Sequence, residues 1–98
     1  NREMASDLGS LIKAIALCDR PSAVHVAHRV HGAALIMEWS ALGQSAERLE
    51  SLLRAEQGWD NPVYAQALQA LVEHWHALGA DTAFDVLAPA RSTRMAPR

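Results

Sequence analysis

Five histidines in a chain of 98 residues are the side chains most able to do chemistry, since the chain has a single cysteine. Imidazole can act as a nucleophile, a proton carrier or a metal ligand near neutral pH. Three of the five follow one another at intervals of three residues, the spacing of one helical turn, at His25, His28 and His31. The other two, His74 and His76, flank a tryptophan, and we interpret them as polar flank positions of a helix.

The direction in which each histidine points follows from the apolar residues around it. A helix over residues 21–37 has an apolar stripe made of Ala23, Ala27, Val30, Ala34 and Met37. At 100° per residue, His28 and Gly32 point roughly 140° away from this stripe, whereas His31 lies on its flank. We therefore expect His28 to face solvent beside a residue that has no side chain, which leaves room for another protein to approach the ring.

Metal binding is one alternative use of these histidines, because His25 with His28, and His28 with His31, are pairs that can reach one ion. Zinc sites normally need three or four protein ligands, and the only other nearby candidates are acids on neighbouring helices. The paired Glu-x-x-His motifs of di-iron bundles do not occur, since Glu73 and His76 form only one such pair. We predict no metal site and keep a histidine-based metal-binding bundle as the lesser alternative.

Other classes of function find little support in the sequence. No oxyanion-loop or glycine-rich elbow surrounds any serine or cysteine, and neither GxxxxGK[ST] nor GxGxxG occurs, so we expect no kinase activity of the chain's own. The net charge of -2 gives no basic field for nucleic acid or an anionic membrane surface. Cys18 cannot form an internal disulfide, and no apolar run approaches the roughly 18 residues of a membrane span. These features predict a cytoplasmic protein without direct membrane contact.

Four amphipathic segments must position the histidines. Apolar residues at helical spacing predict helices over about 2–18, 21–37, 40–57 and 62–78, with Gly58 ending the third. One-sided helices joined by short links can bury their stripes only against each other, which predicts an all-α, antiparallel up-down four-helix bundle. Residues 81–88 allow a short extra helix, so we assign 1–88 to the bundle and 89–98 to a disordered basic tail.

The segment around His28 resembles a known signature. Residues 27–34 read AHRVHGAA, which is similar to the A-H-x-L-K-G-[SA] motif of histidine-containing phosphotransfer (HPt) domains. Leu42 and the ERLE of residues 47–50 resemble the recurrent L…LE of that family's third helix. Two positions depart from the pattern: His31 stands where the family usually has lysine, and Glu38 stands where it often has glycine. Because glutamate is disfavoured at positive φ, Glu38 indicates a different turn.

The resemblance implies a role for each matching residue. His28 would accept the phosphoryl group, Glu50 would orient its ring by hydrogen bonding, and Gly32 would keep the site accessible. His31 or Arg29 would stabilise the phosphoryl group in place of the usual lysine. A neutral imidazole attacks through one nitrogen only if the other holds the proton, and a carboxylate can fix that tautomer.

The same resemblance implies a phosphocarrier in a multistep phosphorelay. Its partners would be the receiver domains of a hybrid kinase and of a response regulator, and the receiver would supply Mg²⁺, so that the chain needs no cofactor of its own. Because the chain begins at Asn1, we expect a piece of a longer protein, similar to the cytoplasmic C-terminal module of an unorthodox hybrid sensor histidine kinase of the BvgS or EvgS type in the inner membrane. The main alternative is a structural or protein-interaction bundle without phosphotransfer.

Overall fold

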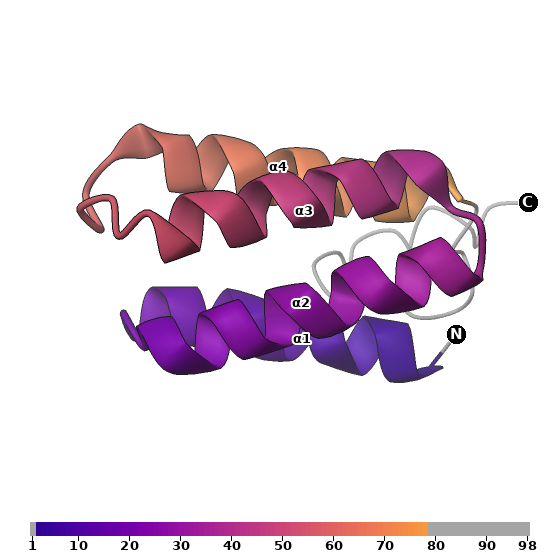
Figure 1. The fold of residues 1–98 in the computed structure, drawn as a ribbon, viewed down its shortest axis with the longest axis horizontal. Helices are drawn as coiled ribbons and strands as arrows, with labels where there is room; N and C mark the ends of the chain where they lie inside the picture. The colour runs from indigo at the N-terminus through magenta and orange to yellow at the C-terminus, as the bar shows by residue number, and fades with distance from the viewer. Residues whose placement is uncertain (1, 79–98) are drawn as a thin grey trace, which may run out of the picture.

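The computed structural model describes residues 2–78, which form four helices and no strand. The helices are α1 (Arg2–Ala16), α2 (Arg20–Ile36), α3 (Ser40–Arg54) and α4 (Pro62–Ala77). They lie lengthwise beside one another, and the connections alternate between the two ends of the molecule (Figure 1). This confirms the predicted all-α, antiparallel up-down bundle. The short helix expected over 81–88 and the tail over 89–98 lie outside the described residues.

The core is a single apolar cluster to which all four helices contribute. The contribution of α2 to this core is unusual because its buried side chains are nearly all small: Ala23, Ala27, Val30 and Ala34. This helix packs against both α1 and α3. Small side chains at a helix contact allow the two helix axes to approach closely. Side chains on the edges of α2 and α3 can therefore reach one another across the seam between the helices.

Side chains cap the starts of α2 and α4. The Asp19 carboxylate accepts a hydrogen bond from the Ser22 amide at 3.3 Å, and the Asn61 side-chain oxygen accepts one from the Val63 amide at 3.0 Å. A proline stands in the first turn of each of these helices, where the missing N–H costs nothing. Asp19 and Asn61 thus fix where the two helices begin.

Non-glycine residues end three of the helices in the left-handed conformation. Cys18, Glu38 and Glu56 have φ values of 56°, 63° and 57°. After α2 the amide of Glu38 donates to the carbonyl of Leu35 at 3.1 Å, and that of Trp39 donates to Ala34 at 2.9 Å. These are the two bonds of a Schellman turn, which usually has glycine at the left-handed position. The expectation that Glu38 imposes a different turn is therefore wrong, because the glycine-type turn forms with glutamate in it.

The end of α3 also differs from the prediction. The helix ends at Arg54 rather than Gln57, and Gly58 is not its left-handed terminator. Two other helices bind the last carbonyls instead: Arg20 Nη1 donates to Leu53 O at 2.8 Å, and the Tyr64 hydroxyl donates to Leu52 O at 3.2 Å. Satisfying these carbonyls from α2 and α4 stabilises an earlier end than local sequence indicates.

No helix within residues 2–78 has the length and apolar character needed to cross a membrane.

Candidate functional site

His28 lies near the middle of α2 and faces solvent, as its angle from the apolar stripe predicts. Its side chain is 67% exposed. His25, one turn earlier on the same helix, is exposed as well. The exposure of His28 leaves its ring available to another molecule, although one ring nitrogen is already engaged by the protein.

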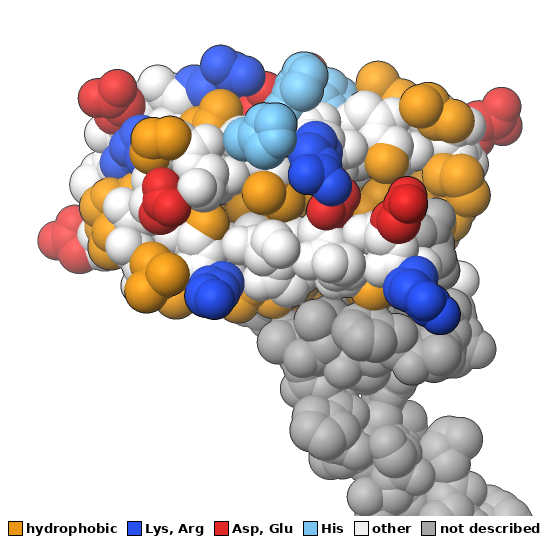
Figure 2. Space-filling view, turned by 90° about the horizontal axis from the view of Figure 1, so that it is seen from below, with side chains coloured by type: hydrophobic (Ala, Val, Ile, Leu, Met, Phe, Trp, Pro, Cys, Tyr) orange, Lys and Arg blue, Asp and Glu red, His pale blue; other side chains and the backbone are white. Residues whose placement is uncertain are grey.

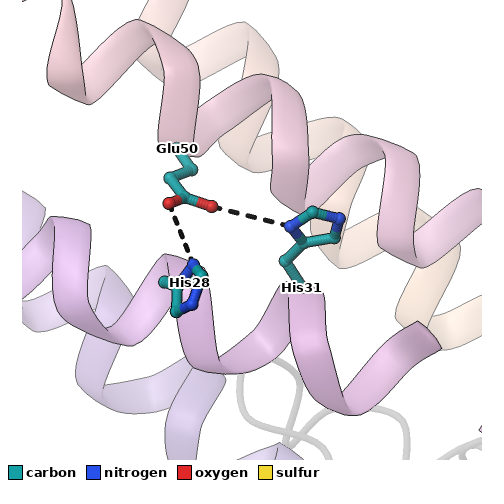
Figure 3. A group of neighbouring side chains, drawn as sticks. All are labelled: His28, His31 and Glu50. Atoms are coloured by element: carbon teal, nitrogen blue, oxygen red, sulfur yellow. Dashed lines mark hydrogen bonds and ion pairs between the residues drawn. The ribbon is translucent and has the colours of Figure 1, made fainter. Parts of the chain in front are cut away.

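That nitrogen contacts Glu50, which reaches across from α3. The distance from His28 Nδ1 to Glu50 Oε2 is 3.1 Å, and the Glu50 side chain is only 11% exposed (Figure 3). The two residues are 22 positions apart in sequence, so the packing of α2 against α3 brings them together. The structure thus places the predicted orienting carboxylate against the predicted phosphoacceptor.

His31 approaches the other oxygen of the same carboxylate. Its Nδ1 lies 3.6 Å from Glu50 Oε1, within ion-pair range but too long for a hydrogen bond. With its side chain 22% exposed, His31 occupies the flank of α2 that the sequence predicts. Figure 3 shows both histidines projecting from α2 toward Glu50, with the carboxylate between them.

Arg54 completes this group and was not among the predicted site residues. Its Nε and Nη2 donate to Glu50 Oε2 at 3.0 and 2.8 Å. The two residues are four apart on α3, with the acid first, which is the favourable order for an ion pair on a helix. That spacing is the sequence signal that could have identified Arg54. Arg54 and His28 contact the same oxygen, so Glu50 Oε2 bridges the guanidinium and the imidazole ring.

The partners of Glu50 determine its charge. Burial raises the pKa of its carboxyl, but hydrogen bonds from Arg54 and His28 and their charges outweigh this effect and hold the pKa below its usual value. Glu50 is therefore a carboxylate at neutral pH. An ionised carboxylate only accepts hydrogen bonds, so the His28 nitrogen that contacts it must carry the proton. With Nδ1 protonated, the lone pair of a neutral His28 ring is on Nε2.

A search against descriptions of known protein families matches residues 2–80 to the Hpt domain. The chain belongs to the Hpt domain family. Domains of this family transfer phosphoryl groups through a histidine in phosphorelays and interact with receiver domains. Neither a search of curated proteins nor one of solved structures found a match.

The face of this Hpt domain that carries the histidines is open to a partner. Figure 2 shows histidine side chains gathered on the surface, with a basic side chain beside them. A Cβ atom built on Gly32 would meet nothing within 4 Å. Backbone packing therefore does not demand glycine at this position. The space beside His28 is free surface that an approaching protein could occupy.

Arg29 lies apart from the carboxylate group of this Hpt domain. Its Nη2 donates to Asp7 Oδ1 on α1 at 2.8 Å, so its guanidinium is paired on the opposite side of α2 from Glu50. Its predicted role toward a phosphoryl group would require this pair to open. The structure brings together His28, His31 and Glu50 from the predicted set, together with the unpredicted Arg54, and leaves Arg29 outside.

Proposed function

We propose that His28 is the phosphoacceptor and that it reacts through Nε2, taking a phosphoryl group from the aspartyl phosphate of one receiver domain and giving it to the aspartate of another. The observation that carries the proposal is the contact between His28 Nδ1 and Glu50. This contact fixes one tautomer on an exposed ring, so that a nucleophilic lone pair is presented on a surface that a receiver can approach.

In the transfer, the Nε2 lone pair attacks phosphorus, an N–P bond forms, and the bond from phosphorus to the aspartyl oxygen breaks. The aspartate leaves as a carboxylate, and the imidazole ring becomes positively charged because Nδ1 keeps its proton. The Glu50 carboxylate, at 3.1 Å from Nδ1, stabilises that positive charge. Transfer to the second aspartate is the reverse of these bond changes, so the ring returns to its neutral form.

Cationic groups near the ring can offset the charge of the phosphoryl oxygens. Arg54 is the best placed of these groups, because it binds the Glu50 oxygen that His28 also contacts. Its side chain is 59% exposed, so it can turn toward a phosphoryl group. His31 occupies the position of the family's usual lysine and contributes a positive charge only when protonated. Arg29 remains a candidate if its pair with Asp7 opens. Positioning and electrostatics of this kind account for most of the catalysis of phosphoryl transfer.

We place this carrier in a hybrid sensor histidine kinase that faces the cytoplasm, with the receivers of that kinase and of a response regulator as its partners. The resemblance of residues 27–34 to the phosphotransfer signature supports the exchange with receiver domains. The receiver would supply the Mg²⁺ ion that neutralises the charge of the phosphoryl oxygens. A bundle with a purely structural role would have no use for the tautomer-fixing contact at His28.

The test is to incubate the chain with receiver domains phosphorylated by a small phosphodonor, and to look for acid-labile, alkali-stable phosphate on it. His28→Gln should fold normally, since the side chain is exposed, and should take up no phosphate. His25→Gln is the matched control, because it removes an exposed histidine one turn away and should leave labelling intact. Labelling of the His28→Gln variant would show that another histidine is the acceptor. A wild-type chain that no receiver labels would favour the structural alternative.

A further inference from the structure

We propose that His28, His31 and Glu50 form a binding site for a divalent cation of the zinc type, and that the ion competes with phosphoryl transfer. Among the described residues, these three form the only group of at least three histidine, cysteine or acidic side chains with ligand atoms close enough to share an ion. One ligand atom from each residue lies within 4.8 Å of the other two. The effect on transfer depends on the proposed function, whereas binding of the ion does not.

The separations match those of a small coordination sphere. Two ligands held about 2.0–2.1 Å from a tetrahedral Zn²⁺ are about 3.4 Å apart. His28 Nδ1 lies 3.1 Å from Glu50 Oε2 and His31 Nδ1 lies 3.6 Å from Glu50 Oε1, so each histidine is about this far from one oxygen of the carboxylate. Small rotations of the side chains would therefore bring all three to bonding distance.

The chemistry of the three ligands selects the class of ion. Two imidazoles and one carboxylate suit Zn²⁺ and other first-row transition ions, whereas Mg²⁺ and Ca²⁺ prefer oxygen ligands alone. Three protein ligands leave at least one coordination position for water or another group. Figure 3 shows the ligands converging from two helices, so the packing of α2 on α3 holds them together before an ion arrives.

Arg54 does not prevent this arrangement. Its two hydrogen bonds go to Glu50 Oε2, while His31 lies nearest Oε1, so an ion can use Oε1 without breaking the ion pair. The positive charge of Arg54 weakens the attraction for a cation. It is also exposed and can move into solvent.

An ion at this position would block His28 in two ways. Coordination through Nδ1 replaces the hydrogen bond to Glu50 and requires that nitrogen to give up its proton. The neutral ring then carries its proton on Nε2, which has no lone pair left to attack phosphorus. The ion and its remaining ligand also occupy the surface next to the ring, where a receiver would have to dock. Because His31 supplies the third ligand, a chain with lysine at this position would not offer the same site.

The direct test is a titration of the full 98-residue chain with ZnCl₂, by calorimetry and by nuclear magnetic resonance of the imidazole nitrogens. We expect one bound ion, with shifts at His28 and His31 but none at His25. His31→Gln should weaken binding about tenfold or more, since losing even an outer-shell partner of a metal site typically costs 10–100-fold. His25→Gln is the matched control and should bind like the wild type.

Circular dichroism of each variant checks its fold. Glu50→Gln serves as a second ligand variant in case His31→Gln does not fold. Absence of zinc binding, or equal binding by wild type and both ligand variants, would overturn the site. Zinc should then be added to labelling by a phosphorylated receiver in excess Mg²⁺, with the extent of labelling compared with and without zinc for each protein. Equal inhibition of wild type and His31→Gln would overturn the competition. Failure of labelling without zinc would instead refute the proposed function and leave the binding result standing.

Discussion

Replacing the Glu50 carboxylate separates the two contributions it can make to phosphoryl transfer. Glu50→Gln keeps a carbonyl that can accept the hydrogen bond from His28 Nδ1 but removes the negative charge. Glu50→Leu removes both the charge and the acceptor. If Glu50 both fixes the tautomer and stabilises the charged ring, the rate of transfer should fall in the order wild type, Glu50→Gln, Glu50→Leu.

The size of the charge effect follows from the contact distance and the exposure of the two groups. Opposite charges about 4 Å apart attract by about 1 kcal/mol in water and about 4 kcal/mol at the effective dielectric of a protein surface. His28 is 67% exposed and Glu50 only 11%, so solvent screening reduces the value to about 1–2 kcal/mol. This corresponds to transfer about 5–30-fold slower in Glu50→Gln. Loss of the hydrogen bond in Glu50→Leu should add about 1 kcal/mol, or another factor of about five.

The assay is the rate of phosphoryl transfer from one labelled receiver, with thermal unfolding of each variant measured in parallel. Glu47→Gln provides the matched control, because it removes the same charge from an exposed position one turn earlier on α3. If Glu47→Gln slows transfer as much as Glu50→Gln, the effect comes from net charge rather than from the contact with His28. Equal rates for wild type and Glu50→Leu would refute the role of the carboxylate altogether.

Four further variants test the helix ends and the approach to the site. Gly32→Ala should stabilise the protein by about 1 kcal/mol, since its Cβ meets nothing, whereas Gly32→Phe should fold but transfer poorly because the ring covers the approach to His28. Glu38→Gly should raise stability by about 0.5–1 kcal/mol in denaturant unfolding and leave transfer unchanged, because glycine tolerates a φ of 63°. Arg20→Ala should lower stability by about 1–3 kcal/mol, since it removes hydrogen bonds at the end of α3 and a contact over the Trp59 ring.

The number of helices and the direction of His28 could be predicted because both depend on local periodicity. An apolar stripe fixes which way a helix faces, and the opposite side of α2 is then exposed wherever the helix packs. The capping pairs before α2 and α4 are local in the same sense, since each involves residues within three positions of one another. These features need no knowledge of which helix packs on which.

The helix ends and part of the site could not be predicted, because they depend on contacts between helices. The carbonyls of Leu53 and Leu52 at the end of α3 are bound by Arg20 from α2 and Tyr64 from α4. The Schellman turn after α2 is local, but it forms with Glu38 at a position where residue preference favours glycine. Arg29 follows His28 directly in sequence, yet one helical step of 100° turns it toward Asp7 on α1. Two residues that are adjacent in sequence on a helix thus lie on different faces and contact different helices.

The α2–α3 seam explains why one carboxylate can serve three partners. The buried positions of α2 are mostly alanines, so α3 packs closely and the Glu50 side chain lies between the helices rather than in solvent. From there one oxygen faces His28 and Arg54, and the other faces His31. A phosphoryl group or a cation that binds to one of these side chains must therefore change the hydrogen bonds and the charge interactions that Glu50 makes with the other two. A site of this kind couples the nucleophilicity of His28 to whatever occupies His31 and Arg54, which an isolated surface histidine could not do.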